Sequence, residues 1–156
     1  MINLVNVLFI CLGNICRSPM SEAYMRHIIK QNNLSDKINV SSRATSSYNV
    51  GNPPHHGTQT ILNKLNIDFS NIISKKLTEK DLSTNDYIIV MDDSNMRDVT
   101  NINPNIKIHK LTDFIKNSSH NFVPDPYYTG DFNLTFELIK AGCDSILEHI
   151  INDKKL

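Results

Sequence analysis

Apolar residues along the chain follow two kinds of pattern. Residues 5–11 (VNVLFIC) and 87–91 (YIIVM) are short, nearly continuous apolar runs, which are typical of parallel strands buried on both faces. Weaker runs at residues 38–42 and 106–111 predict two further strands. Between these runs, apolar residues recur every three or four positions, which is the spacing of an amphipathic helix.

Local signals predict where the helices begin. Ser18 and Pro19 are expected as the N-cap and the first position of a helix that follows the first strand directly. A turn at residues 51–54 precedes a second helix, and Thr78 with Asp81 resembles a capping box. Asp92 can cap a helix that extends through residue 99, and an apolar stripe over residues 136–150 predicts a terminal helix.

The alternation of strands and helices predicts an α/β fold: a single domain over residues 1–156, with a four-stranded parallel sheet and helices on both faces. Such sheets bind ligands at the carboxyl ends of their strands, where the loop after residue 11 lies. Residues 116–131 show no regular pattern and contain VPDPYY. A loop of this length in a compact domain is usually functional.

Composition narrows the class of protein. Lys plus Arg and Asp plus Glu both number 16, so no net charge attracts nucleic acid or a membrane surface. The three cysteines are an odd number, which favours a reduced cytosolic protein over a disulfide framework. The first apolar run is too short to span a bilayer. We therefore expect a cytoplasmic protein with neither a nucleic acid nor a membrane as its partner.

The loop after the first strand contains the motif Cys-x5-Arg, from Cys11 to Arg17. Gly13 permits a tight turn and Asn14 tolerates a left-handed backbone, so the N–H groups of residues 12–18 can point inward as an anion cradle. The guanidinium of Arg17 can bind two oxygens of a phosphoryl group. The same positive surroundings stabilise a thiolate, which predicts that Cys11 is a nucleophile.

The sequence VLFICLGNICRSP, followed by DPYY near residue 125, resembles the low-molecular-weight protein tyrosine phosphatases. The resemblance continues through ATSSYNVGNPP, LTEKD, DYIIVMDDSNMRDV and VPDPYY, in the order found in the family. It implies hydrolysis of protein phosphotyrosine and small aryl phosphates through a phosphocysteine, with no metal and no cofactor. Phosphate, sulfate or vanadate is expected as the active-site anion, and the protein as a monomer or weak dimer.

By this resemblance, Cys11 is the nucleophile, Arg17 binds the phosphoryl group and Asp125 is the general acid and then the base. Leu12, Gly13, Asn14, Ile15, Cys16 and Ser18 complete the phosphate loop. On its own chemistry, Asp125 between two prolines is a suitable acid on a long loop, although Asp-Pro is also common in plain turns. Ser18 has two interpretations: a helix N-cap or a hydrogen-bond donor to the Cys11 thiolate.

The residues expected around the cleft are apolar and aromatic: Leu12, Tyr48, Tyr127 and Tyr128, which suit a flat aryl group. Cys16 is either a small buried residue or the partner of Cys11 in a reversible disulfide. Cys143 is expected in the core. The pair His55-His56 is interpreted as a solvated turn and not as a metal site.

Four departures from the family pattern concern the cleft rim and the residues behind the loop: Arg43, His55, Gly57 and Asn71. Three other functions stay open. Arginine phosphatases of the family typically have Thr where this chain has Ile15, and arsenate reductases need further relay cysteines, for which Cys143 is poorly placed. A catalytically silent phosphate-binding module is the alternative from another class.

Overall fold

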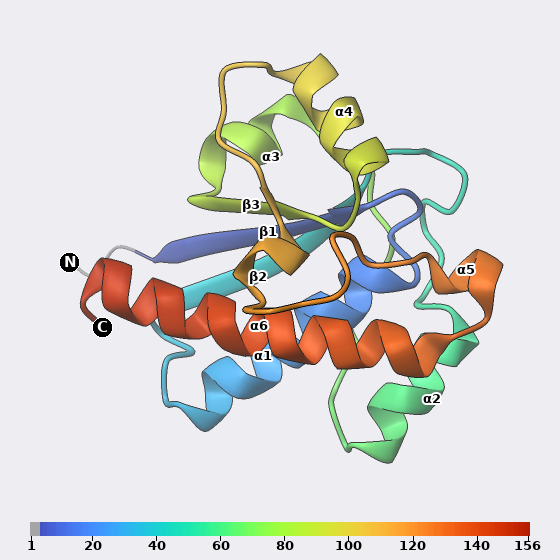
Figure 1. Ribbon diagram of the computed structural model, residues 1–156, viewed down its shortest axis with the longest axis horizontal. Coiled ribbons are helices and arrows are strands. Elements are labelled where there is room, and N and C mark those ends of the chain that lie inside the picture. The colour runs from blue at the N-terminus through green and yellow to red at the C-terminus, as the bar shows by residue number, and fades with distance from the viewer. Residues whose placement is uncertain (1–3) are drawn as a thin grey trace.

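The computed structural model describes residues 4–156. Four parallel strands form one sheet in the order β2-β1-β3-β4, with β1 at Val5–Cys11, β2 at Ile38–Ala44, β3 at Tyr87–Val90 and β4 at His109–Lys110. Helices cover both faces (Figure 1). The predicted fold class is therefore confirmed.

Strand β1 has a continuous apolar sequence because each of its faces meets a separate core. Val7 and Phe9 pack with α1 (Arg17–Gln31) and α6 (Phe132–Lys154), whereas Leu8 and Ile10 pack on the other face. That second core is closed by α3 (Glu79–Thr84) and α4 (Asp93–Ile102), above the sheet in Figure 1. Complete burial of one such side chain stabilises the fold by about 1.5–3 kcal/mol.

The predicted start of the first helix and the predicted length of the fourth strand were wrong. Helix α1 begins at Arg17, with Cys16 at the N-cap position, and Ser18 lies inside the first turn. Strand β4 pairs only at two residues, because the chain turns at once into the short 3₁₀ helix Leu111–Phe114. Ile106 and Ile108 nevertheless pack against the core. The alternation of apolar and polar residues at positions 106–111 therefore reflects the burial of these side chains and not strand pairing.

The remaining helices frame the carboxyl edge of the sheet. Helix α2 spans His56–Lys64, and the short helix α5 spans Pro126–Thr129 inside the segment predicted to be irregular. The capping box of Thr78 and Asp81 and the N-cap at Asp92 are confirmed. Helix α6 begins at Phe132, four residues before the predicted start, because Asp131 caps it through the N–H of Leu134.

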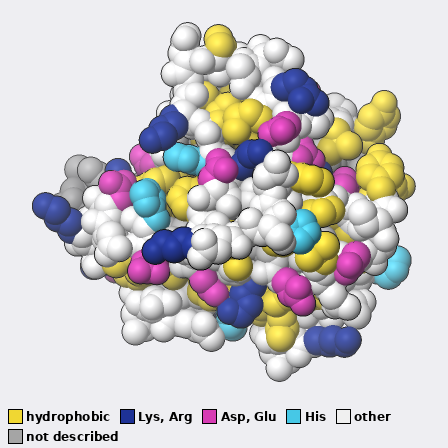
Figure 2. Space-filling model, viewed as in Figure 1, with side chains coloured by type: hydrophobic (Ala, Val, Ile, Leu, Met, Phe, Trp, Pro, Cys, Tyr) yellow, Lys and Arg dark blue, Asp and Glu magenta, His cyan; other side chains and the backbone are white. Residues whose placement is uncertain are grey.

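The surface carries no dominant charge on the face shown in Figure 2, where acidic and basic side chains are interspersed. Hydrophobic side chains gather on that face toward the end of the molecule that carries α5. Within residues 4–156, no helix is both long and apolar enough to cross a membrane.

Candidate active site

The loop between β1 and α1 turns its carbonyl groups outward. The carbonyls of Cys11 and Leu12 accept from the backbone N–H groups of Thr45 and Ser46, and that of Gly13 accepts from the Ser74 hydroxyl. By contrast, none of the backbone N–H groups of residues 12–16 donates to a protein acceptor within the described part of the chain. The N–H groups of the loop are thus left without protein acceptors, which is the arrangement that an anion cradle requires.

Asn14 braces this loop from within. Its backbone has φ of 55°, the left-handed conformation expected for it, and its side chain is buried. The side-chain oxygen accepts from the N–H of Lys75 at 3.0 Å, which fixes the amide orientation because a backbone N–H can only donate. The amide nitrogen then donates to the hydroxyls of Ser18 and Ser42, at 2.8 Å each.

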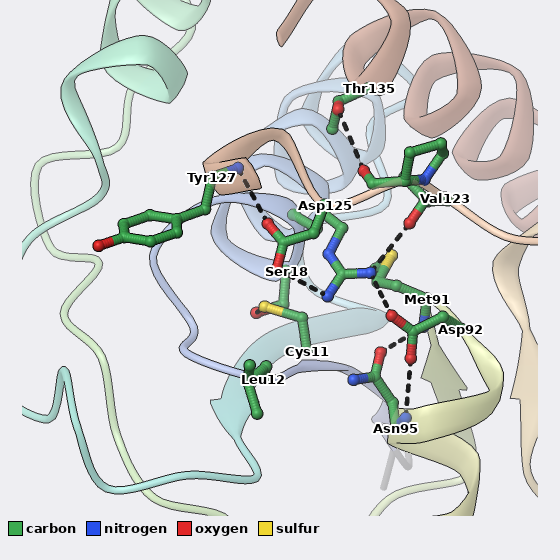
Figure 3. Close-up of polar contacts among 12 residues, drawn as sticks. Cys11, Leu12, Ser18, Met91, Asp92, Asn95, Val123, Asp125, Tyr127 and Thr135 are labelled. Atoms are coloured by element: carbon green, nitrogen blue, oxygen red, sulfur yellow. Dashed lines mark hydrogen bonds and ion pairs between the residues drawn. The ribbon is translucent and has the colours of Figure 1, made fainter. Parts of the chain in front are cut away.

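The Ser18 hydroxyl contacts Cys11, the predicted nucleophile. Its oxygen lies 3.0 Å from Sγ of Cys11, and Figure 3 shows the two side chains together. Because Ser18 already accepts a hydrogen bond from Asn14, its own proton is free to point at the sulfur. Of the two interpretations of Ser18, the structure therefore supports the donor to Cys11, since helix α1 has no side-chain cap.

Behind Asn14, the hydrogen bonds continue through Ser42 of β2 to Glu22 and Arg26 of α1. Ser42 donates to Glu22 at 2.6 Å, and Glu22 pairs with Arg26. Ser42, Glu22 and Arg26 were not predicted to support the site. The only indication in the sequence was that these polar residues stand in elements whose other residues are mostly buried.

Arg17 is buried, with a relative exposure of 2%, and is held from two directions. One terminal nitrogen, Nη1, donates to Asp92 at 2.7 Å and to the carbonyl of Val123 at 2.9 Å, and Nη2 lies 3.4 Å from Asp125. Burial disfavours its charge, but the nearby Cys11, Asp125 and Asp92 outweigh burial and raise the pKa of Arg17. Its Nε has no protein partner within residues 4–156, which leaves a donor for an anion.

Two aspartates approach Arg17, and their surroundings differ. Both oxygens of Asp92 make close hydrogen bonds: one accepts from Arg17 at 2.7 Å, and the other accepts from the N–H of Asn95 in α4 at 2.8 Å. Asp125 caps α5 through the N–H of Tyr127 at 3.0 Å, and its second oxygen makes only the longer contact with Arg17 (Figure 3). Asp125 is therefore the carboxylate that can turn toward a bound group, and Asp92 is a support for Arg17.

A cleft of about 320 Å³ opens above Cys11. Its lining includes all four predicted side chains: Leu12, Tyr48, Tyr127 and Tyr128, together with Ile15. The tyrosines are largely exposed, Tyr48 by 92%. A larger hollow of about 710 Å³ lies between α1 and β2, but neither Cys11 nor Asp125 lines it, so the cleft is the candidate site.

The chain matches the family model described as low molecular weight phosphotyrosine protein phosphatase over residues 6–156. It belongs to the low molecular weight phosphotyrosine protein phosphatase family. The low molecular weight protein-tyrosine-phosphatase PtpA of Staphylococcus aureus is 47% identical over 155 residues, or 98% of each chain. The resemblance inferred from the loop motifs is confirmed.

Two solved structures of similar fold extend the comparison. YfkJ from Bacillus subtilis has a TM-score of 0.94 and 41% identity, over 97% of this chain and 98% of that one. The Drosophila arginine phosphatase DARP has a TM-score of 0.84 and 32% identity, over 92% of this chain and 96% of that one. Proteins similar to this chain are thus named for different substrates, PtpA as a protein-tyrosine-phosphatase and DARP as an arginine phosphatase.

The departures from the family pattern are accommodated locally. Arg43 points away from the site, with its Nε 3.2 Å from Asp81 of α3. Asn71 is exposed, and the oxygen of Asn14 is satisfied by Lys75. Cys143 is fully buried, as expected. His55 was misjudged as a solvated turn, because its Nδ1 accepts from the N–H of Gly57 and caps α2.

Proposed function

We propose that the chain hydrolyses protein phosphotyrosine and small aryl phosphates through a phosphocysteine. The single observation that carries the proposal is the cradle around Cys11: outward carbonyls, free N–H groups, and a buried arginine with an unpartnered Nε. Such preorganised donors stabilise the charge of a phosphoryl group in the transition state. The phosphate loop of this proposal comprises residues 12–18, and the N–H groups of residues 12–16 have no protein acceptor within residues 4–156.

The proposed reaction has two steps. The Cys11 thiolate attacks phosphorus and forms an S–P bond, while the P–O bond to the leaving group breaks and Asp125 donates a proton to the departing oxygen. In the second step, Asp125 takes a proton from water, which attacks the phosphocysteine and releases phosphate. The Ser18 hydroxyl, 3.0 Å from the sulfur, stabilises the thiolate when it leaves.

The cleft favours an aryl substrate. Leu12, Tyr48, Tyr127 and Tyr128 provide flat apolar walls, and Ile15 offers no polar side chain to a leaving nitrogen. Phosphotyrosine is therefore preferred over phosphoarginine, although the fold also occurs in an arginine phosphatase. Turnover of tyrosine, serine and arginine phosphoproteins, measured with a chelator present, tests this proposal. Faster release from arginine would reverse the assignment.

The other two alternatives receive less support. Arsenate reduction by a relay of cysteines needs a reachable third thiol, but burial raises the pKa of Cys143 well above its usual value, and the residue is fully enclosed. A silent phosphate-binding module would have no use for Asp125 beside the cradle. Hydrolysis of a chromogenic aryl phosphate separates the enzyme from the silent module.

Replacement of Arg17 by lysine should lower kcat/KM by about 10²–10³-fold, because an ammonium cannot bind two phosphoryl oxygens in one plane. The variant also loses the contacts that Nη1 makes to Asp92 and Val123. Steady-state kinetics on an aryl phosphate measure the effect, with Arg43→Lys as a control remote from the cleft. A loss below about tenfold would show that the backbone N–H groups suffice.

Mild peroxide is predicted to join Cys11 and Cys16 reversibly. Peroxide oxidises the Cys11 thiolate to a sulfenic acid, and the Cys16 sulfur then displaces its hydroxyl as water, which forms the disulfide. Burial, followed by the charge of Cys11, raises the pKa of Cys16 to about 12, so bridge formation should quicken at alkaline pH. Mass spectrometry after oxidation checks the bridge; sulfinic acid on Cys11 beside a free Cys16 thiol would rule it out.

A further inference from the structure

The start of α2 touches both halves of the active site. On one side, the backbone N–H of His55 donates to the carbonyl of Ile15 at 2.7 Å, and the Thr58 hydroxyl donates to the carbonyl of Cys16 at 3.2 Å. These are two of the outward carbonyls of the phosphate loop. The start of α2 therefore helps to hold the loop in the shape that leaves its N–H groups free.

On the other side, the imidazole of His55 packs against the segment that carries the acid. It stacks on Phe132, with ring centroids 5.1 Å apart and planes at 20°, and meets Tyr127 edge-on at 6.1 Å. Tyr127 belongs to α5 and Phe132 is the first residue of α6. Figure 1 shows α5, α2 and the beginning of α6 at the same end of the molecule.

The side chain of His55 is fixed in this place by its own hydrogen bond. Nδ1 accepts from the N–H of Gly57 at 3.0 Å, which requires an unprotonated Nδ1. Burial, followed by the charge of His56, lowers the pKa of His55 and so favours that form. Gly57 is needed for the stack, because a Cβ there would lie 2.6 Å from the Phe132 ring.

We propose that His55 is a positioning residue for the general acid, holding α5 at a set distance from the phosphate loop. The inference rests on the proposed function, since it concerns the acid assigned there. Asp125 is tied to α5 through the N–H of Tyr127, so a shift of α5 moves its carboxylate. The contact of Asp125 with Arg17 is long, at 3.4 Å, and gives little independent restraint.

Two substitutions separate the two contacts of the His55 side chain, the cap of α2 through Nδ1 and the stack of its ring on Phe132. His55→Asn keeps a side-chain oxygen that can cap α2 but loses the ring, whereas His55→Phe keeps a ring that can stack on Phe132 and loses the cap. With a poor leaving group such as tyrosine, His55→Asn should lower kcat/KM by about 10–10²-fold, because small displacements of a catalytic group are costly. An activated aryl phosphate needs the acid less, so its kcat/KM, which reports only the steps up to the phosphocysteine, should fall by less than about threefold.

The KM and the inhibition constant for inorganic phosphate should stay near those of the wild type, since the cradle itself is intact. His55→Phe should restore most of the lost kcat/KM on tyrosine and melt at a lower temperature. His56 is unsuitable as a control because its ring stacks on His55, with centroids 4.5 Å apart. Lys64→Gln, at an exposed position near the end of α2, is the matched control and should leave both substrates unchanged. Phe132→Leu removes the stack from the opposite side and should reproduce the selective loss.

Because His55 and Phe132 act through one contact, the double variant His55→Asn with Phe132→Leu should lose no more than the larger single loss. Equal losses on both substrates, or additive losses in the double variant, would overturn the positioning role. Wild type and Asp125→Ala are measured in parallel. If wild type is inactive, or Asp125→Ala does not depend on the leaving group, the proposed function fails; if both behave as expected and His55→Asn matches wild type, only this inference fails.

Discussion

Cys11→Ser should abolish turnover and leave anion binding intact. The free N–H groups of the loop and Arg17 do not depend on the sulfur, so inorganic phosphate or vanadate should still bind with near wild-type affinity. A serine hydroxyl stays protonated at neutral pH and is a far weaker nucleophile than a thiolate. We therefore expect kcat to fall by about 10⁴-fold or more, as for the loss of other enzymatic nucleophiles.

Two measurements make this test specific. Rapid quenching of the wild-type reaction should trap phosphate on Cys11, and the serine variant should show no phosphate on residue 11. Cys143→Ala removes a fully buried thiol away from the cleft and serves as the control, which should keep its kcat and lose only stability. Substantial residual hydrolysis by Cys11→Ser would refute the covalent mechanism.

The sheet was predictable because its central strands are buried on both faces. Continuous apolar runs have few alternative placements in a small domain, and β1 and β3 occupy the centre of the sheet as those runs indicated. The edge strand was not predictable in length. Ile106 and Ile108 alternate with polar residues because they pack on the core, and this periodicity does not report how many hydrogen bonds the backbone makes.

The start of α1 shows how chemistry can override a capping signal. Ser-Pro normally marks a helix N-terminus, but the Ser18 hydroxyl here contacts Cys11 and Asn14 inside the first turn. Pro19 is still accommodated, because the first turn of a helix leaves its N–H groups without intrahelical acceptors. The catalytic contact and the helix therefore coexist, with the helix beginning at Arg17.

Residues that support the site from distant positions in the chain are hard to predict, because the sequence around each of them does not indicate the contact. The bonds from Arg17 to Asp92 and Val123 join residues 75 and 106 positions apart. Asp92 was foreseeable only in part: it follows a central strand, and the carboxyl ends of parallel strands meet at one edge of the sheet. The sequence indicated its role as a helix cap, and the structure adds its role as the support of Arg17.

Asp125→Ala should slow the release of a poor leaving group such as tyrosine by about 10²–10⁴-fold, which is the usual contribution of general acid catalysis. A nitrophenolate can leave largely as the anion, so an activated aryl phosphate should lose much less in kcat/KM, which reports only the steps up to the phosphocysteine. The plot of log kcat/KM against leaving-group pKa should become steeper. Substrate affinity should stay near normal, because the variant removes a carboxylate that repels a phosphate dianion.

The control is Asp125→Asn, which keeps a side-chain oxygen that can cap α5 through the N–H of Tyr127 but has no proton to give. It should show the same leaving-group dependence as alanine with a smaller loss of stability. If both variants lost equally on good and poor leaving groups, Asp125 would act only by shaping α5. Asp92 is then the remaining carboxylate at Arg17, but both of its oxygens are engaged, so a proton from Asp92 would first require the ion pair at 2.7 Å to break.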